Sequence, residues 1–434
     1  MSPETVGIIG IIVLLILFVL GMPIAFTMGF VGFLGFSYLV SSSAGLSLLA
    51  RDIFEQLSSY PLSTIVTFVL MGTFAFASGI TGRLYGTVYT WVGQLRGGLT
   101  MASILACAFF AAICGSTSAT AATVGKIALP EMRKYNYDDT LATGAVAAGG
   151  TLGILIPPSA LFIVYGILTQ QSIGKLFVAG VLPGVLLTAL FIATVYLICS
   201  RNPALGPPGL STSWKQKLKA FTGIIEVLVI FGLALGGLFA GWFTPTQAGG
   251  IGAAGALLIG LARRELSWQK FLDACKECLL TSSMILFIIA GATIFGHFMA
   301  VSKVPMLLAS FVEEAAMPPL AVIIFVCLIY LVGGCFMDAL ALVVLTMPII
   351  FPIVMANGFD PIWFGVMMVL LTEAAVITPP VGVNVYVIHG IAPDVPLETI
   401  FKGIFPFLGA LIVCMAILIA FPKIATFLPS LITY

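Results

Sequence analysis

The chain has 434 residues, of which 60% are hydrophobic and only 8% are charged, and its formal net charge is +1. So few charged side chains cannot coat the surface of a soluble globule of this size, which excludes a soluble protein and leaves no soluble domain of useful length. The net charge gives no reason to expect nucleic acid as a partner. The environment that the composition predicts is a lipid bilayer.

Apolar runs suited to membrane helices recur along the whole chain. A helix that spans the bilayer needs about 20 consecutive apolar residues. The long runs are Val6 to Leu20, Ile24 to Val40, Phe177 to Cys199, Ile224 to Trp242, Leu279 to Phe298 and Ile404 to Phe421. The first run follows a start without the basic region of a cleaved signal, so we expect it to be retained. With the shorter segments, about ten to twelve membrane segments fit, and the predicted fold class is an all-α polytopic membrane protein.

The distribution of the 18 Lys and Arg residues predicts how these segments are oriented in the membrane. With both termini threaded outside, thirteen of them fall on the inner side, including those of the linker 201–219 that divides the chain. Four fall outside, and Lys126 lies apart, within a hairpin. Because cytoplasmic segments carry the excess of Lys and Arg, we expect both termini on the outer side of the membrane.

One stretch of the chain is repeated half a chain later. The stretch from Pro130 to Pro158, which ends in a Pro-Pro pair, recurs without a gap from Pro352 to Pro380, at an offset of 222 residues. An odd number of predicted connections between the two copies places them in opposite orientations. Inverted repeats with Gly/Pro-interrupted apolar segments in corresponding places are typical of secondary transporters.

Ahead of the proline pair, each copy predicts two short helices joined by a polar tip. They run from Met101 to Ile113 and from Ala119 to Pro130, then from Leu320 to Val332 and from Ala339 to Pro352. At about 1.5 Å of rise per residue, each is too short to cross about 30 Å of hydrocarbon comfortably. We therefore expect two re-entrant hairpins whose tips, at 114–118 and 333–338, lie near the middle of the membrane.

A broken helix follows each hairpin, at 149–159 and at 371–384. Proline removes a backbone donor and disfavours helix in the preceding residue, so a Pro-Pro pair ends the helix and leaves carbonyls without partners. Within a membrane, such backbone is tolerated only where it is buried in protein or lines a wet cavity. The broken segments are therefore predicted to form a binding site, where a cation can satisfy the carbonyl oxygens.

The first tip offers groups for both anions and cations. Ser116, Thr117 and Ser118 open a helix, so backbone amides and a positive dipole end suit an anionic substrate. The same hydroxyls, with the carbonyls of residues 150 to 153, are hard oxygen ligands that suit a small alkali cation. The alternative is that these hydroxyls only bond to their own backbone or join helices together.

Two carboxylates and two polar residues belong to the same segments. Asp338 is the equivalent of Ser116, and a carboxylate at membrane depth is costly unless it is paired or ligating. We predict a cation ligand, with a salt bridge to Lys126 or exposure at the hairpin mouth as the alternative. Glu373 is predicted either to support an ion site or to carry a proton. Asn384 and Ser159 either orient substrate or cap their helices.

Cysteine and histidine give no sign of an enzyme. The eight cysteines mostly lie within apolar runs, where a thiol behaves as a small hydrophobe. A metal or redox role for the pair at 275 and 278 lacks the further ligands that a metal site needs. His297 is predicted to be a hydrogen-bonded packing residue, and Glu226 to pair with the basic linker or extend to the membrane surface. No combination of nucleophile, base and metal emerges, so we expect no catalytic residues.

Four motifs in order resemble the large membrane subunit of TRAP (tripartite ATP-independent periplasmic) transporters. They are CGSTSATAATVG at 114–125, GTLGILIPPS at 150–159, FMD at 336–338 with Pro348 and Pro352, and ITPPVGVN at 377–384. The resemblance implies sodium-driven uptake of an organic acid that a periplasmic binding protein delivers, across the inner membrane of a bacterium or archaeon. It also implies a small four-helix membrane subunit, which we expect to be a separate polypeptide because this chain begins directly with the large one.

The resemblance further implies an elevator-type transporter with an inverted repeat, in which the hairpins and broken helices form a transport domain that moves against a scaffold. It places one sodium ion among Ser116, Thr117, Ser118, Gly150 and Thr151, and another among Gly334, Asp338, Thr372 and Thr378. The residues predicted to contact substrate are Ser118, Pro157, Pro158, Ser159, Pro379, Pro380 and Asn384. Two or more sodium ions are expected as the coupling ions.

The predicted domains follow from this division. They are 1–97 (first scaffold and arm helices), 98–173 (first hairpin and broken helix), 174–316 (scaffold, linker and second arm), 317–392 (second hairpin and broken helix) and 393–434 (C-terminal helix). The alternatives are a stand-alone sodium/dicarboxylate symporter of the same architecture and a proton-coupled carrier that uses Asp338 or Glu373 as a relay. An ion channel or a membrane enzyme is less consistent with the pattern. The identity of the organic acid is left open.

Overall fold

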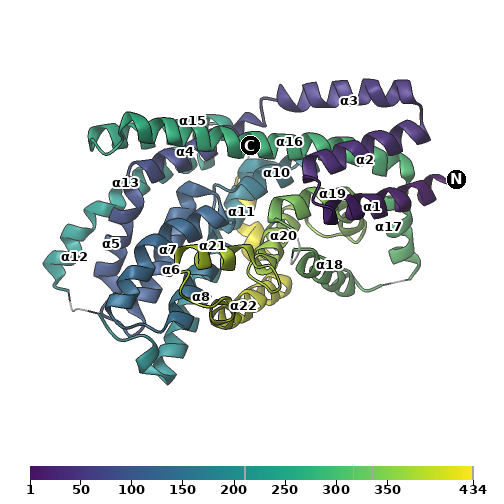
Figure 1. Cartoon of the computed structure of the whole chain (residues 1–434). Helices are drawn as coiled ribbons and strands as arrows, with labels where there is room; N and C mark the ends of the chain where they lie inside the picture. Colours follow the sequence, from purple (N-terminus) through teal and green to yellow (C-terminus); the bar gives the residue numbers. More distant parts are fainter. Residues whose placement is uncertain (210–211, 316, 335–336, 433–434) are drawn as a thin grey trace.

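The computed structural model describes residues 1–209, 212–315, 317–334 and 337–432, and this part of the chain is built from helices and their connections (Figure 1). The helices of the first half are α1 (Pro3–Val19), α2 (Ile24–Leu39), α3 (Ser42–Leu57), α4 (Ser63–Ala77), α5 (Ile80–Val92), α6 (Gly98–Cys114), α7 (Thr117–Lys134), α8 (Asp139–Gly150), α9 (Leu152–Leu155), α10 (Ala160–Thr169) and α11 (Ile173–Arg201). The linker contains the 3₁₀ turn η1 (Pro203–Leu205) and α12 (Trp214–Ala220).

The second half repeats this order. Its helices are α13 (Thr222–Phe231), the π-helical turn η2 (Gly232–Gly236), α14 (Gly237–Phe239), α15 (Pro245–Ala262), α16 (Trp268–Ser302), α17 (Val304–Glu314), α18 (Pro319–Gly334), α19 (Ala339–Ala356), α20 (Pro361–Ala375), α21 (Val383–Ile391), α22 (Leu397–Ala420) and α23 (Lys423–Ser430). Both ends of α7 and α19 differ by the offset of 222 that the sequence repeat predicts. The duplication is therefore visible in the helices themselves.

Equivalent polar residues begin equivalent helices. The Asp138 carboxylate accepts hydrogen bonds from the first amides of α8, and the Asp360 carboxylate does the same for α20. Ser116 caps α7 and Asp338 caps α19. Because a side-chain oxygen that satisfies the first amides of a helix fixes where the helix begins, these residues define the helix starts of both copies.

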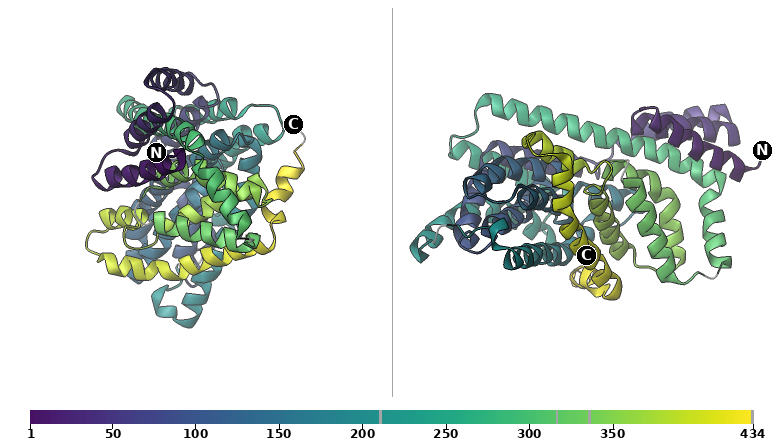
Figure 2. Two further views of the ribbon diagram at one scale, coloured as in Figure 1. Left: turned by 90° about the vertical axis from the view of Figure 1, so that its right-hand side faces the viewer. Right: turned by 60° about the horizontal axis from the view of Figure 1, so that its bottom comes forward.

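The helices outside the hairpins interlock between the two copies. α2 packs along α16, and its counterpart α15 packs along α4, the counterpart of the second part of α16. Figure 2 shows α16 running along one edge of the molecule beside the N-terminal helices. α16 is continuous over 35 residues, whereas in the first copy the turn around Pro61 separates α3 from α4. Each copy therefore supplies half of a shared frame.

Six helices of the described part are long and apolar enough to cross a membrane, or eight spans when each of two bent pairs is counted as one. Five further apolar helices, α1, α2, α6, α18 and α20, are shorter. The predicted ten to twelve segments therefore include helices too short to span the bilayer alone. The first helices of both hairpins, α6 and α18, are in this short group.

The second arms of the hairpins are longer than predicted. We expected them to end at Pro130 and Pro352, but α7 continues to Lys134 and α19 to Ala356 with these prolines inside the helix. A proline in the last turns removes only one amide from the hydrogen-bond ladder, and the rest of the helix tolerates this loss where neighbouring helices pack against it. α19 thereby reaches a length that could cross a membrane.

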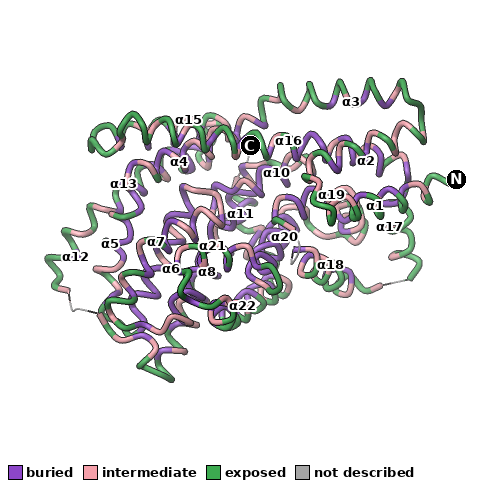
Figure 3. Tube along the Cα trace, in the orientation of Figure 1, coloured by how far each residue is buried: buried purple, intermediate pink, exposed green. Residues whose placement is uncertain are grey.

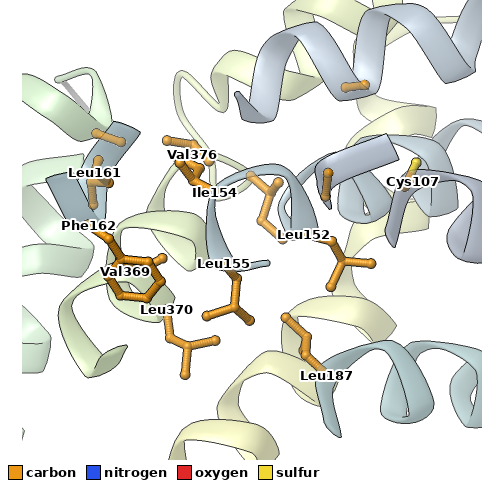
Figure 4. Packing of buried hydrophobic residues seen from close by; sticks show 14 of the residues in the cluster. Cys107, Leu152, Ile154, Leu155, Leu161, Phe162, Leu187, Val369, Leu370 and Val376 are labelled. Atoms are coloured by element: carbon orange, nitrogen blue, oxygen red, sulfur yellow. The ribbon is translucent and has the colours of Figure 1, made fainter. Parts of the chain in front are cut away.

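The first broken helix lies in the centre of the apolar core. α8 and α9 together meet α10 at a bend of 40°, and the chain between them passes through Pro157 and Pro158. α9 contacts α11 and α20, and Figure 4 shows Leu152 and Leu155 among the side chains of Leu187 and Leu370. The break is thus held by apolar packing on several sides.

Burial separates a central group of helices from the outer ones (Figure 3). α20 is buried from Trp363 to Ala375, and most of α6 and α8 is buried too. α3 and α12 are largely exposed, with an apolar and a polar side on α3. We refer below to α6–α10 and α18–α21 as the hairpin group, since they contain both hairpins and both broken helices.

Candidate functional site

A cavity of about 540 Å³ lies where the two tips and the two broken segments meet. The first tip lines it with residues 114–119 and the second with residues 338–340. The first broken segment contributes Ile154 and Ala160, and the second contributes Val376, Val383 and Asn384. Four segments that are far apart in the sequence therefore form one space.

The opposite wall of the cavity comes from outside the hairpin group. α4 lines it with Val69, Gly72, Thr73 and Phe76, and α16 lines it with Glu277, Thr281, Met284 and Ile285. α4 is the counterpart of the second part of α16. The cavity therefore lies between the hairpin group and one pair of helices of the frame, α4 and α16.

The first tip is tied to the second broken helix. The Thr117 hydroxyl donates a 2.5 Å hydrogen bond to Oε1 of Glu373 on α20. The other carboxyl oxygen of Glu373, Oε2, has no hydrogen-bond partner among the described residues, although the side chain is fully buried. A buried carboxyl oxygen without a partner is costly, so this atom is available to a cation, a proton or a water molecule.

The first tip packs against the helix of the first break through two glycines. A methyl group at Gly150 would lie 3.1 Å from the Thr117 carbonyl oxygen, and one at Gly153 would lie 2.5 Å from the Ser116 carbonyl oxygen. Larger residues at these positions would push the tip away. The structure thus brings Gly150 beside the Thr117 carbonyl and Gly153 beside the Ser116 carbonyl.

Thr151, in the first predicted sodium set, points elsewhere. Its buried hydroxyl donates to the carbonyl of Ala148 in its own helix, and it does not line the cavity. Donation uses the proton of a hydroxyl and leaves its lone pairs, so the oxygen can still act as a ligand.

The second predicted set is partly assembled at the second tip. Asp338 lines the cavity, and its Oδ2 accepts a hydrogen bond from the Leu340 amide at 3.1 Å. No ion pair joins it to Lys126 within the described part of the chain, so the alternative of a salt bridge is not found. Gly334 packs closely against Ala375. Cys335 and Phe336 lie outside the described residues.

The two threonines of this set bond to their own helices. Thr372 donates to the carbonyls of Met368 and Val369, and Thr378 donates to that of Ala374. Gly334, Thr372 and Thr378 do not line the cavity. Donation to the backbone leaves the lone pairs of both threonine hydroxyls for a ligand.

Among the residues predicted to contact substrate, Ser118 and Asn384 line the cavity. The Asn384 amide donates to the Ala147 carbonyl of α8 at 3.0 Å, and its Oδ1 has no partner among the described residues. Ser159 is buried and caps α10, its alternative role. The prolines at 157, 158, 379 and 380 do not line the cavity; they shape the breaks that do.

Sequence reasoning missed the wall formed by α4 and α16, including Glu277, and did not place Lys126 in the cavity. Lys126 and Glu277 both line it. Lys126 could have been found, because a lysine inside a hairpin predicted to lie at membrane depth is itself a signal. The wall from α4 and α16 could not, because no motif on those helices points toward the tips.

Glu226 has partners that differ from the predicted basic linker, and His297 has a polar partner, as expected of a hydrogen-bonded packing residue. Glu226 accepts hydrogen bonds from Arg83 and Arg263 rather than from the basic linker, at 2.7 to 2.9 Å. His297 lies 3.2 Å from the buried carboxylate of Asp52 on α3. Both clusters join frame helices to one another, away from the cavity.

Comparisons with known proteins cover nearly the whole chain. A family model described as the tripartite ATP-independent periplasmic transporter, DctM component, matches residues 11–424. The C4-dicarboxylate TRAP transporter large permease DctM of Pseudomonas aeruginosa is 36% identical over 399 residues, covering 90% of this chain and 91% of that protein. The sialic acid TRAP transporter large permease SiaM of Vibrio cholerae is 32% identical, covering 95% of each chain.

A longer relative and two solved structures extend the comparison. The isethionate TRAP transporter permease DctMQ of Oleidesulfovibrio alaskensis is 34% identical, over 94% of this chain and 64% of that protein. The fold resembles the YdaH transporter of Alcanivorax borkumensis, with a TM-score of 0.65 at 14% identity, over 89% of this chain and 91% of that one. It also resembles MtrF of Neisseria gonorrhoeae, with a TM-score of 0.56 at 14% identity, over 98% and 95% of the chains.

These matches agree with the four motifs and with the cavity that the motifs form. Members of the family are permeases, so this multi-pass membrane chain is a transport protein and not an enzyme. The chain belongs to the DctM family of large permease subunits of tripartite ATP-independent periplasmic transporters.

Proposed function

We propose that this permease imports an organic acid anion together with sodium ions through the cavity at the two tips. The observation that carries the proposal is the convergence of both tips and both broken segments on one space of about 540 Å³. This volume is within the range of small-molecule sites. Helix ends and breaks at such a place supply amides for an anion and oxygens for a cation.

The proposed sodium ligands are the two sets named from the resemblance. At the first, the Thr117 carbonyl oxygen lies beside Gly150, and Glu373 adds a carboxylate that accepts a hydrogen bond from the Thr117 hydroxyl. At the second, Asp338 supplies charge, and Thr372 and Thr378 have oxygen lone pairs left after donating to their own backbone. Hard oxygen donors of this kind suit an alkali cation.

The substrate class rests on the relatives. The names of these relatives mention C4-dicarboxylates, sialic acid and isethionate, all of which are organic acids or their anions. The Asn384 side chain and the hydroxyl of Ser118 line the cavity and can orient polar groups of such an acid. The prolines of the two breaks act indirectly, by ending the helices beside the site.

The proposed motion is of elevator type. The cavity separates the hairpin group from α4 and α16. A displacement of the hairpin group along these two helices would therefore carry the site with it. The interlocked frame supports this division, because α2 with α16 and α15 with α4 hold each other across the two copies. Two domains of this kind, one mobile and one fixed, are what alternating access requires.

The proposed partners are a small four-helix membrane subunit and a periplasmic binding protein that delivers the acid. The relatives that are named as TRAP transporter large permeases support these partners. With the basic segments on the cytoplasmic side, the termini are periplasmic and the protein is in a bacterial or archaeal inner membrane.

Reconstitution tests this proposal. The chain is placed in liposomes with the small subunit and the binding protein of the same organism, and uptake of radiolabelled succinate, N-acetylneuraminate and isethionate is measured. We expect uptake of at least one acid when sodium is higher outside, and none when sodium is equal or the binding protein is omitted. Sodium-driven uptake without any binding protein would instead support the stand-alone symporter.

The buried Glu373 favours a second candidate, coupling to protons. Its Oε2 has no partner among the described residues, and a carboxyl there could carry a proton across with the substrate. The same liposomes distinguish the two ions. Uptake that persists without sodium under an imposed pH gradient, and is lost in Glu373→Gln, would favour the proton; uptake that follows sodium alone would reject it.

A further inference from the structure

Lys126 is the cationic side chain of the cavity, and the transport proposal gives it no role. The cavity lining includes three charged residues in the described part of the chain, namely Lys126, Glu277 and Asp338. Lys126 is the cation among them, and it is exposed to the cavity. Within the described residues, no acceptor bonds to its ammonium and no carboxylate lies within 4 Å of it. A lysine at membrane depth is costly unless it faces water or a partner.

The helix that carries Lys126 aims it at the same space as the first tip. Ala119, Ala122, Thr123 and Lys126 line the cavity at the i, i+3, i+4 and i+7 spacing that marks one face of α7. The rise from Ser116 to Lys126 is about 15 Å along the helix. Because side chains on a helix lean toward its N-terminus, the ammonium inclines toward the tip.

The repeat shows that this lysine is not needed to build a hairpin. At the offset of 222, the position of Lys126 in the second copy is occupied by Pro348, on α19. The tip position shows the reverse difference, with neutral Ser116 in the first copy and Asp338 in the second. One hairpin therefore presents a cation to the cavity and the other a carboxylate.

We propose that Lys126 is a substrate-binding residue whose ammonium binds one carboxylate or sulfonate group of the transported acid. Asp338, on the opposite hairpin, would attract the sodium ion. One hairpin would therefore bind the anionic acid and the other the cation. This assignment rests on the proposed function. It implies that an acid whose anionic group is masked as an amide loses the benefit of Lys126.

The kinetic test uses the full chain with its small subunit and binding protein in liposomes. It measures uptake of whichever of succinate, N-acetylneuraminate and isethionate the wild type transports. Removing a hydrogen bond to a charged group predicts that Lys126→Gln raises KM about ten- to hundredfold. Lys126→Arg, which keeps the charge, recovers a large part of this loss. The sodium concentration for half-maximal uptake stays unchanged in both.

The matched control is Lys134→Gln. Lys134 lies on the same helix, outside the cavity, and pairs with the neighbouring Glu131 at the surface. The variant Lys134→Gln changes the net charge and the helix composition in the same way as Lys126→Gln. We expect its KM to stay at the wild-type value. An unchanged KM in Lys126→Gln, or an equal rise in Lys134→Gln, overturns the assignment while leaving sodium-driven transport intact.

A second measurement uses the wild-type protein and needs no variant to fold. An amine-reactive reagent labels lysines of the purified complex with and without saturating acid, and mass spectrometry reads each site. The acid protects Lys126 but not Lys134 if the assignment is right. Equal labelling of Lys126 with and without acid overturns it. Failure of all three acids to enter liposomes would instead count against the proposed function. The labelling experiment would still test the assignment, because it asks only whether an acid protects Lys126.

Discussion

Asp338 and Glu373 are residues at which the two copies of the repeat differ in charge near the site. Asp338 faces the cavity and caps α19, whereas Glu373 is fully buried and receives the Thr117 hydroxyl. Their counterparts in the first copy, Ser116 and Thr151, are neutral. The second copy therefore supplies both carboxylates, Asp338 at the second proposed sodium set and Glu373 beside the first.

Replacing Asp338 by Asn tests this at the residue scale. Asn keeps a cap for α19 but removes the charge, so we expect the sodium concentration for half-maximal uptake to rise about tenfold or more, by the magnitude of one charge-assisted contact. The control is Asp360→Asn, which changes a helix-capping carboxylate outside the cavity. Equal loss of folded protein in the membrane for both variants would argue that Asp338 acts only as a cap.

The sequence predicted the positions of these residues through the offset of 222 but not their contacts. The repeat aligns Asp338 with Ser116 and Glu373 with Thr151. It does not reveal that Thr117 meets Glu373, because that bond joins the tip of one copy to the broken helix of the other. Contacts between copies depend on how two packed halves face each other, and this is a tertiary property.

At the scale of elements, the tips and breaks were predictable and the helix ends were not. The helices end at the tips and breaks for local reasons. Capping side chains and glycines begin and end the helices at the tips, and the missing amides of the Pro-Pro pairs end them at the breaks. The ends of α7 and α19 were wrong by four residues, because prolines 130 and 352 are accommodated within the helices. Packing against neighbouring helices outweighed the local preference.

Gly150→Ala tests the contact between the first tip and the first broken helix. The added methyl group would lie 2.7 Å from the Ala121 side chain and 3.1 Å from the Thr117 carbonyl oxygen. Overpacking of this kind costs about 1–3 kcal/mol, so we expect a lower melting temperature and weaker apparent sodium affinity. Gly409→Ala on α22 is the control, since nothing lies within 4 Å of its added methyl group. Wild-type sodium affinity in Gly150→Ala would argue against a sodium site at this contact.

At the scale of the molecule, the frame has its own ion pairs. Glu226 on α13 holds Arg83 of α5 and Arg263 beyond α15, and Arg83 also bonds Glu265. None of these residues lines the cavity. Neither this network nor the interlocked packing of α2 with α16 could be predicted, because no sequence motif joins the partners.

Glu226→Gln therefore separates stability from transport. Two guanidinium groups lose their common carboxylate, so we expect the free energy of unfolding to fall by about 1–3 kcal/mol, measured as a lower melting temperature in detergent. Glu265→Gln, at a more exposed site, should have a smaller effect. The apparent sodium affinity of the folded fraction should match the wild type. A shifted affinity in Glu226→Gln would contradict a frame that is separate from the site.

The most direct measurement is an experimental structure of the complex in sodium with a transported acid bound. We expect density for the acid in the cavity between 116–118 and 338–340, near Asn384, and density for an ion within ligand distance of each tip. Acid bound away from this cavity, or tips that lie at the water boundary with no ion beside them, would contradict the account.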